Sequence, residues 1–550
     1  MAGVDRRGGL LAMAAIAWLL SLAASASSGT SRPQSPPWAS PGPLFDTSHN
    51  CMACHNGLTT TAGEDISLGV SWRATMMANS ARDPYWQASV RREILDHPAE
   101  AAEIEHECSV CHMPMSHTQQ VAEGRTGTIF EHLPAGAGTT PEAALAADGV
   151  SCTACHQITS DRLGRPESFT GGYVIDPRPG GSRRIFGPYA VNPGRTRLMH
   201  SATGFVPVES PHVRQSELCA TCHTLYTRPR GPDGTELGAF PEQVPYLEWR
   251  HSAYRDERSC QSCHMPVVTE PTRMASVLGE LRDGIARHTF RGGNFFMLRM
   301  LNRYRNDLGV EALPQELEAS ARDTLEHLRT ESAVVRISRA ERAGDGILVD
   351  VVVENLSGHK LPTAYPSRRA WLHLTVRDRS GTVVFESGAV TADGRIVGND
   401  NDDDPAKAEP HHLEIGRPGD VQIYESIMAD AGGRITTGLL KAVTYVKDNR
   451  LLPRGFDKST APPDVAVQGA AREDPDFASP GDATRYRIAL GRSEGPFRIE
   501  VELLYQPIGF RWADNLRGYD APEPARFVNY YRSMSAASSA VLGRADARVD

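Results

Sequence analysis

The pattern Cys-x-x-Cys-His occurs five times in this 550-residue chain and accounts for all ten of its cysteines. We number the units along the chain as motifs 1 to 5: Cys51-Cys54-His55, Cys108-Cys111-His112, Cys152-Cys155-His156, Cys219-Cys222-His223 and Cys260-Cys263-His264. Chance placement of ten cysteines and 19 histidines would give far fewer than one such unit. One chemical cause must therefore explain all five.

Covalent haem attachment explains this spacing. Two thiols one short turn apart add to the two vinyl groups of a haem, and the adjacent histidine reaches the iron as the proximal ligand. Zinc ribbons also pair Cys-x-x-Cys units, but they give no reason for a histidine behind every pair. Disulfide frameworks are typical of chains richer in cysteine than this one, which has ten in 550 residues. A thiol redox motif would not recur five times. We therefore predict five haem c groups, each with its iron.

The N-terminus predicts export. Arg6 and Arg7 precede an apolar run over 10–24 and the small residues Ala24-Ser25-Ala26, so we expect a signal peptide over 1–26. An uncleaved anchor is the alternative, although the run is shorter than the about 20 residues of a membrane span. A Pro/Ser-rich linker follows over 27–44. We expect a periplasmic protein without stable membrane insertion, with secretion or outer-membrane association as further locations.

The first half of the chain resembles periplasmic multihaem c-type cytochromes, in particular the group related to the tetrahaem cytochrome of the hydroxylamine-oxidation pathway. The matching stretches cover roughly residues 45–300: "SWRATMMANSARDPYWQA", "CSVCHMPM", "DGVSCTACHQ", "SELCATCHTLYT", "CQSCHMP" and "RHTFRGGN". This chain departs from a tetrahaem pattern by its fifth motif and its long C-terminal addition. The resemblance implies a pentahaem cytochrome domain over 45–293.

The second axial ligand of each iron separates a carrier from an enzyme, because an electron carrier normally closes both axial positions. Fourteen histidines remain beside the proximal ones. His288 ranks first because "RHTFRGGN" matches the family, and His200 and His212 follow because they lie shortly before motif 4. Four histidines are weaker candidates, because a residue so close in sequence to an attachment cysteine has little freedom to reach another haem. They are His49, His106, His117 and His251.

Two further ligand candidates carry explicit alternatives. His359, in "NLSGHKLPTAYPSRRAW", either reaches across as a distal ligand or is a turn histidine bound to the backbone. Met77 stands where relatives often show histidine, and a methionine ligand would raise the potential of its haem. Packing of Met77 against a porphyrin face is the alternative.

The C-terminal half changes to a strand pattern. We expect a helical connector over 294–330 and an antiparallel β-sandwich-like domain over 331–550, in which about eight strands follow one another without intervening helices. The fold class is therefore α+β, with mostly helices and loops in the cytochrome domain. An acidic run over 399–404 offers oxygen atoms of the kind that calcium binds, and a solvated charged turn is the alternative.

These features predict an exported cytochrome that transfers single electrons between redox partner proteins. All five motifs end in histidine, whereas multihaem enzymes that reduce nitrite often mark their catalytic haem with a different proximal residue. An alternative is an oxidoreductase that acts on a small nitrogen or sulfur compound at one open haem, where Arg368 and Arg369 attract the anion. A third hypothesis is that the β-domain is the primary functional part, as an adhesion or assembly module. The net charge of −9 argues against a nucleic-acid partner.

Overall fold

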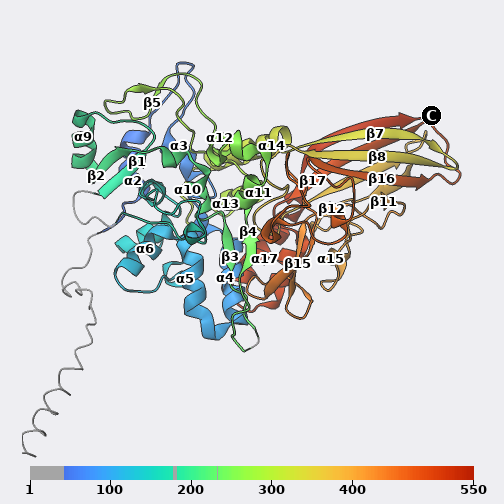
Figure 1. The fold of residues 1–550 in the computed structure, drawn as a ribbon, viewed down its shortest axis with the longest axis horizontal. Helices are drawn as coiled ribbons and strands as arrows, with labels where there is room; N and C mark the ends of the chain where they lie inside the picture. Colours follow the sequence, from blue (N-terminus) through green and yellow to red (C-terminus); the bar gives the residue numbers. More distant parts are fainter. Residues whose placement is uncertain (1–42, 177–182, 232) are drawn as a thin grey trace, which may run out of the picture. The chain divides into compact units, whose positions relative to one another are not determined.

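Short helices form the first half of the described chain, and β-sheets form most of the second half (Figure 1). The computed structural model describes residues 43–176, 183–231 and 233–550. The predicted signal peptide and all but two residues of the predicted linker lie outside these residues. Residues 43–550 form one compact unit. Within the described ranges, no helix is both long enough and apolar enough to cross a bilayer.

The helices of the first half are short, and five of them begin with proline, which is favourable at the first helical position. They are α2 (Ser48–His55), α3 (Leu68–Arg73), α4 (Pro84–Asp96), α5 (Ala101–His112), α6 (Pro114–Ala122), α7 (Pro141–Ala147), α8 (Cys152–His156), α9 (Pro193–Thr203), α10 (Ser216–Ala220), α11 (Pro245–Arg250) and α12 (Cys260–His264). Three strand pairs join them: β1 (Arg183–Gly187) with β2 (Phe205–Glu209), β3 (Leu225–Thr227) with β4 (Phe240–Gln243), and β5 (Thr272–Arg273) with β6 (Leu281–Arg282).

Two helices connect the halves, at the positions where the sequence predicts them. α13 (Phe295–Arg303) packs against α14 (Pro314–Glu331). The buried face of α14 contains Leu317, Ala321, Leu325 and Leu328, as the helical periodicity indicates.

The C-terminal half contains three sheets. One has the order β10-β9-β17-β18 with β12 also on β9, the second has β11-β16-β8-β7, and the third has β14-β13-β15. The strands are β7 (Ala333–Ala343), β8 (Gly346–Asn355), β9 (Arg369–Arg377), β10 (Val383–Ser387), β11 (Glu414–Ile415), β12 (Ile423–Tyr424), β13 (Ser426–Asp430), β14 (Ile435–Thr436), β15 (Ala442–Asp448), β16 (Gly481–Ala489), β17 (Phe497–Gln506) and β18 (Ala540–Val549). All pairings in these sheets are antiparallel except that of β11 with β16.

The alternating pattern of the strands places one face of each large sheet in the core. In β17, Phe497, Ile499, Val501 and Leu503 are buried, and the charged residues between them are exposed or half-buried. β9 and β10 follow one another along the chain and pair antiparallel as a hairpin. The presence of both helices and strands confirms the α+β class.

The expectation of strands without intervening helices is wrong. The C-terminal half also contains α15 (Asp400–Asp403), α16 (Phe510–Asp514) and α17 (Pro522–Met534). α17 returns to the first half and packs against α4: the rings of Phe527 and Tyr85 have centroids 4.9 Å apart, and Arg91 Nε lies 2.9 Å from Glu523 Oε2. Its two prolines and mixed polarity hide the helical period in the sequence.

The main hydrophobic core belongs to both halves. One cluster of buried residues contains Tyr85, Phe240 and Phe295 together with Val351 of β8 and Leu372 of β9. The sheets therefore lack a separate main core, and removal of the first half would expose apolar surface to water. This packing weighs against the hypothesis of a self-contained adhesion module.

We expect Phe527→Ala to destabilise the whole unit by about 3–5 kcal/mol, because this fully buried ring fills the shared core between α17 and α4. Denaturant unfolding followed by both circular dichroism and visible absorbance measures the effect. Both transitions should move together. Asn529→Ala, at an exposed position of the same helix, is the control and should change little. Two separated transitions, only one of them shifted, would contradict a shared core.

Candidate haem-binding sites

Each motif lies on or beside a short helix, which brings its two thiols to one side of the backbone. Motifs 1, 2, 3 and 5 end α2, α5, α8 and α12, and motif 4 spans the C-terminal end of α10. Residues three and four positions apart share one helix face, so the second cysteine and the histidine follow the first cysteine along one surface. All ten cysteines are half-buried and free of disulfide bonds. They are therefore available for thioether bonds to a haem.

Four proximal histidines are oriented by a backbone carbonyl. The Nδ1 atoms of His55, His156 and His264 donate to the carbonyls of Met274, Phe186 and Arg291 over 2.6, 2.6 and 2.5 Å. His112 Nδ1 donates to Ser80 O over 3.3 Å. Because a carbonyl only accepts, the proton is on Nδ1 and Nε2 keeps its lone pair. This is the tautomer and orientation that a metal-binding histidine needs.

Burial lowers the pKa of four proximal imidazoles: to about 4 for His112 and His223, and in the same direction for His156 and His264. A neutral ring offers a lone pair to a metal, whereas a protonated ring does not.

The five motifs are neighbours in a continuous array. Three thiol pairs from different motifs interact, which raises the pKa of the first thiol and lowers that of the second: Cys51 with Cys152, Cys111 with Cys222, and Cys219 with Cys260. Cys155 lies near Cys222: burial raises the pKa of the Cys155 thiol, and the charge of Cys222 raises it further. Motif 4 therefore adjoins motifs 2, 3 and 5, and motif 1 adjoins motif 3.

His288 faces the proximal histidine of motif 3. The ring centroids of His288 and His156 are 6.2 Å apart. Two metal–imidazole bonds of about 2 Å and half of each ring add to about 6 Å, so one iron fits between the rings. His288 Nδ1 donates to Ala286 O over 3.1 Å, which leaves Nε2 free, and burial lowers its pKa to about 4. The two rings have the properties of an axial ligand pair.

His359 faces the proximal histidine of motif 5. The centroids of His359 and His264 are 6.2 Å apart, His359 Nδ1 donates to Lys360 O over 2.9 Å, and burial lowers the pKa of His359 to about 4. His327 competes for the same position with a centroid distance of 6.0 Å. His327 Nδ1, however, lies 3.5 Å from Glu331 Oε1 and has no hydrogen-bond partner in the described residues. The backbone hydrogen bond favours His359.

A buried group of four charges anchors the loop of His359 to the first half. Lys360 Nζ lies 2.7 Å from Asp448 Oδ2, and Arg450 lies 2.8 Å from both Asp448 and Glu248. Glu248 belongs to α11, and its Oε2 accepts a hydrogen bond of 3.1 Å from the backbone nitrogen of Lys360. The two cations hold the pKa of Asp448 well below its usual range. Opposite charges therefore balance inside the core.

The other predicted distal ligands lie in different surroundings. His212 Nε2 donates to Ile158 O over 2.8 Å, and its Nδ1 lies 2.7 Å from Ser210 Oγ, so both nitrogens already have hydrogen bonds. His200 lies half-buried in the second half of α9, and its carbonyl accepts the capping N–H of Gly204. Met77 is half-buried, and its carbonyl accepts a hydrogen bond from Val150, just before motif 3.

His117 stands out among the candidates that the sequence ranks low. It is buried, both of its ring nitrogens lack a hydrogen-bond partner in the described residues, and burial lowers its pKa to about 4. A buried polar ring without partners is costly unless something absent from the chain binds it. The neighbouring ring of His106 accepts Gly127 N–H at Nδ1 over 3.1 Å, which places its proton on Nε2. His117 is therefore the better ligand of the two.

The backbone between motif 2 and His117 is not one continuous helix. α5 ends at His112, and α6 starts afresh at Pro114, so the chain changes direction at Met113 between motif 2 and His117. Trp86 is a second residue that the motifs do not reveal: its ring lies parallel to that of His112, with centroids 4.3 Å apart and an interplanar angle of 3°. It supports the orientation of the motif 2 histidine.

The acidic run at 399–404 includes a buried ion pair. Both carboxylate oxygens of Asp402 bind the guanidinium of Arg369, over 2.7 and 2.9 Å. In the described residues, the groups of His, Cys, Asp and Glu side chains with metal-binding spacing do not include this run. Asp402 is therefore already paired, and calcium binding by this run stays a prediction.

Comparisons with known proteins identify one fold. Neither a protein-family model nor a curated protein matches the sequence. Among solved structures, the chain is similar to a penta-heme cytochrome c552 from Thermochromatium tepidum, with a TM-score of 0.50 and 16% sequence identity. The match covers 92% of this chain and 99% of that chain. The likeness thus extends over both halves, and at this identity it shows that the chain shares the fold of a multihaem cytochrome.

We expect His359→Ala to convert one low-spin ferric haem into a high-spin haem, because motif 5 loses its facing imidazole. Electron paramagnetic resonance of the oxidised holoprotein, integrated against haem content, measures the change. His327→Ala is the matched control and should leave the low-spin count unchanged. The reverse result would assign His327, and not His359, to the iron of motif 5.

We expect the same spectroscopic loss of one low-spin haem in His117→Ala but not in His106→Ala. Only His117 combines burial with two unpartnered nitrogens. Thermal unfolding of both variants controls for misfolding. An unchanged spectrum of a folded His117→Ala protein would rule out ligation by His117.

Proposed function

We propose that this chain is an exported c-type cytochrome that passes single electrons along five covalently bound haems. The continuous order of the motifs carries the proposal, because each motif adjoins another one across the interior of the first half. Haem iron supplies the one-electron chemistry, and the chain fixes the separations of the groups and tunes their potentials through ligands and burial.

In this proposal two haems would each be held by a pair of imidazoles. His156 and His288 would hold the haem of motif 3, and His264 and His359 would hold the haem of motif 5. The 6.2 Å centroid distances and the hydrogen bonds at Nδ1 support both pairs. An iron closed on both sides does not bind substrate, which suits a carrier.

Three further observations support the export and the class. The count of five motifs equals the number of haems in the similar solved structure, a penta-heme cytochrome. The N-terminal pattern of a signal peptide agrees with haem attachment outside the cytoplasm, and we assign the protein to the periplasm. The stretches that resemble the cytochromes of the hydroxylamine pathway support a relation to that group. The partners of this chain are then redox proteins that donate and accept electrons.

Arg368 favours a second candidate, an oxidoreductase for a small nitrogen or sulfur oxyanion at the haem of motif 4. The guanidinium of Arg368 is half-buried near His223. Burial is the main cause of the lowered pKa of that histidine, and the charges of His264 and then Arg368 lower it further. His223 is also the one proximal histidine for which no hydrogen bond at Nδ1 is seen in the described residues. A cation beside this haem would attract an anion. Arg369 does not contribute, because it is bound to Asp402.

An anaerobic reductive titration tests the proposed function. The holoprotein should take up five electrons per chain, and the haems should reoxidise when an artificial acceptor is added. Uptake of fewer than five electrons would contradict the proposal. Stopped-flow mixing of the reduced protein with nitrite, hydroxylamine or sulfite tests the second candidate. A carrier should reoxidise slowly and without dependence on Arg368, whereas rapid reoxidation that Arg368→Ala abolishes would establish the enzyme.

A further inference from the structure

A group of exposed apolar side chains surrounds the hairpin of β5 and β6. Leu278 and Leu281 keep 69% and 60% of their surface exposed, more than any other large apolar residue in the described part of the chain. Val277 on the same hairpin and Val191 and Leu198 on the facing segment are also exposed. We call these five residues the hairpin patch. Exposed apolar residues gathered in this way mark interaction sites.

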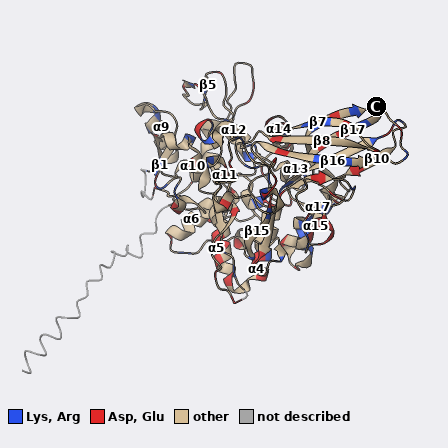
Figure 2. Ribbon diagram, turned by 45° about the vertical axis from the view of Figure 1, so that its right-hand side comes forward, with Lys and Arg blue, Asp and Glu red and all other residues tan. Residues whose placement is uncertain are grey.

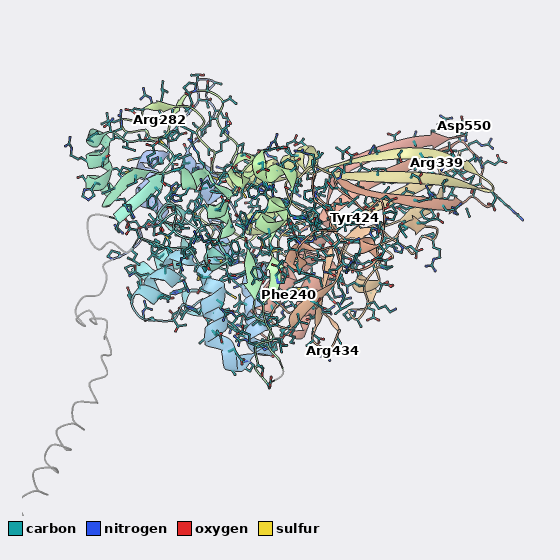
Figure 3. All side chains as sticks on the ribbon, viewed as in Figure 1. Phe240, Arg282, Arg339, Tyr424, Arg434 and Asp550 are labelled. Carbon is teal, nitrogen blue, oxygen red and sulfur yellow. The ribbon has the colours of Figure 1, made fainter. Side chains whose placement is uncertain are left out.

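The hairpin patch is held together by hydrogen bonds between its two segments. Arg195 Nε on α9 donates to Leu278 O over 2.6 Å, and Arg282 Nη2 on β6 donates to Ala190 O over 2.7 Å (Figure 3 labels Arg282). Both guanidinium groups also bind the carboxylate of Glu280. The apolar side chains are thus exposed on an ordered surface.

This surface lies directly against motif 1. Ser276 N donates to Cys54 O over 2.8 Å, and Met274 O accepts the Nδ1 proton of His55. The segment that positions the motif 1 histidine therefore continues into Val277 and Leu278. Motif 1 adjoins only motif 3 among the motif contacts above, so it is one end of the array.

Basic side chains border the hairpin patch. Arg197, Arg214 and Arg273 are exposed, and in the described residues none of them forms an ion pair with a carboxylate. Arg214 and Arg282 lie 5.0 and 5.5 Å from the ring centre of Tyr189, which connects Arg214 to the hairpin. Residues 189–200 and 267–287 together contain five arginines and three acidic residues, in a chain with a net charge of −9. Figure 2 colours lysine and arginine blue and aspartate and glutamate red along the ribbon. The local charge is therefore opposite to that of the whole chain.

We propose that the hairpin patch docks an acidic redox protein that exchanges electrons with the haem of motif 1. The inference rests on the proposed function, because it needs a haem at motif 1. The arginines would attract and orient an acidic surface, and the leucines would exclude water where the two cofactors approach. The position at the end of the array favours a redox protein over other occupants.

Stopped-flow reduction of the oxidised holoprotein by a flavodoxin hydroquinone tests the proposal, because flavodoxin is a small acidic electron donor. At low ionic strength we expect Arg197→Glu/Arg273→Glu to lower the second-order rate constant about 10-fold, an effect that salt should diminish. Leu278→Ser/Leu281→Ser should also lower it, with a weaker dependence on salt. Reduction by a small viologen radical should be unchanged in all variants.

Two matched variants control for charge and polarity elsewhere on the surface. Arg492→Glu/Arg498→Glu reverses two exposed arginines of the C-terminal half, and Val390→Ser/Val397→Ser replaces two exposed valines there. Both should retain the rate with flavodoxin.

Three results would overturn the docking site. The first is that flavodoxin reduces the patch variants and the wild type at equal rates. The second is that the patch variants lose as much rate with the viologen as with flavodoxin. The third is a different occupant: sedimentation showing a dimer that the patch variants dissociate, or binding to anionic vesicles that they abolish, with unchanged flavodoxin rates. Failure of both reductants to reduce any haem would instead refute the proposed function.

Discussion

The hydrogen bond between a proximal histidine and a distant backbone carbonyl is the interaction on which this structure depends. His55 binds the carbonyl of Met274, which is 219 residues away along the chain. His156 and His264 bind carbonyls of segments that follow them. Each bond sets the tautomer and the direction of Nε2, and it also ties a motif to a loop that has little secondary structure of its own. The short helices of the first half are thus ordered by the same contacts that orient the motif histidines.

The C-terminal half completes this arrangement rather than forming an appended module. It supplies His359 opposite His264, and the buried charges of Lys360, Asp448 and Arg450 bind Glu248 of the first half. Breaking one partner of such a group would leave an uncompensated buried charge, which costs several kcal/mol. The shared hydrophobic core also holds the two halves together. Together they hold the loop of His359 beside His264, where the ring centroids are 6.2 Å apart.

Local features of this protein can be predicted from its sequence more readily than its tertiary contacts can. Local spacing identifies the five motifs, and periodicity identifies α14 and β17, because these signals depend on neighbouring residues. The two prolines and mixed polarity of α17 hide its helical period, and its packing on α4 joins residues more than 400 positions apart, which local patterns do not report. The burial of His117 is equally hidden, because the break at Met113 is a feature of the backbone and not of residue spacing. The ion pair of Asp402 with Arg369 also joins separate segments.

The order of the irons is the central claim of this account, and anomalous diffraction at the iron absorption edge from crystals of the holoprotein measures it directly. The account predicts five iron peaks per chain. The peak of motif 4 should have those of motifs 2, 3 and 5 as its neighbours, and the peak of motif 1 should lie next to that of motif 3. Fewer than five peaks, or an iron at motif 1 isolated from that of motif 3, would contradict the array.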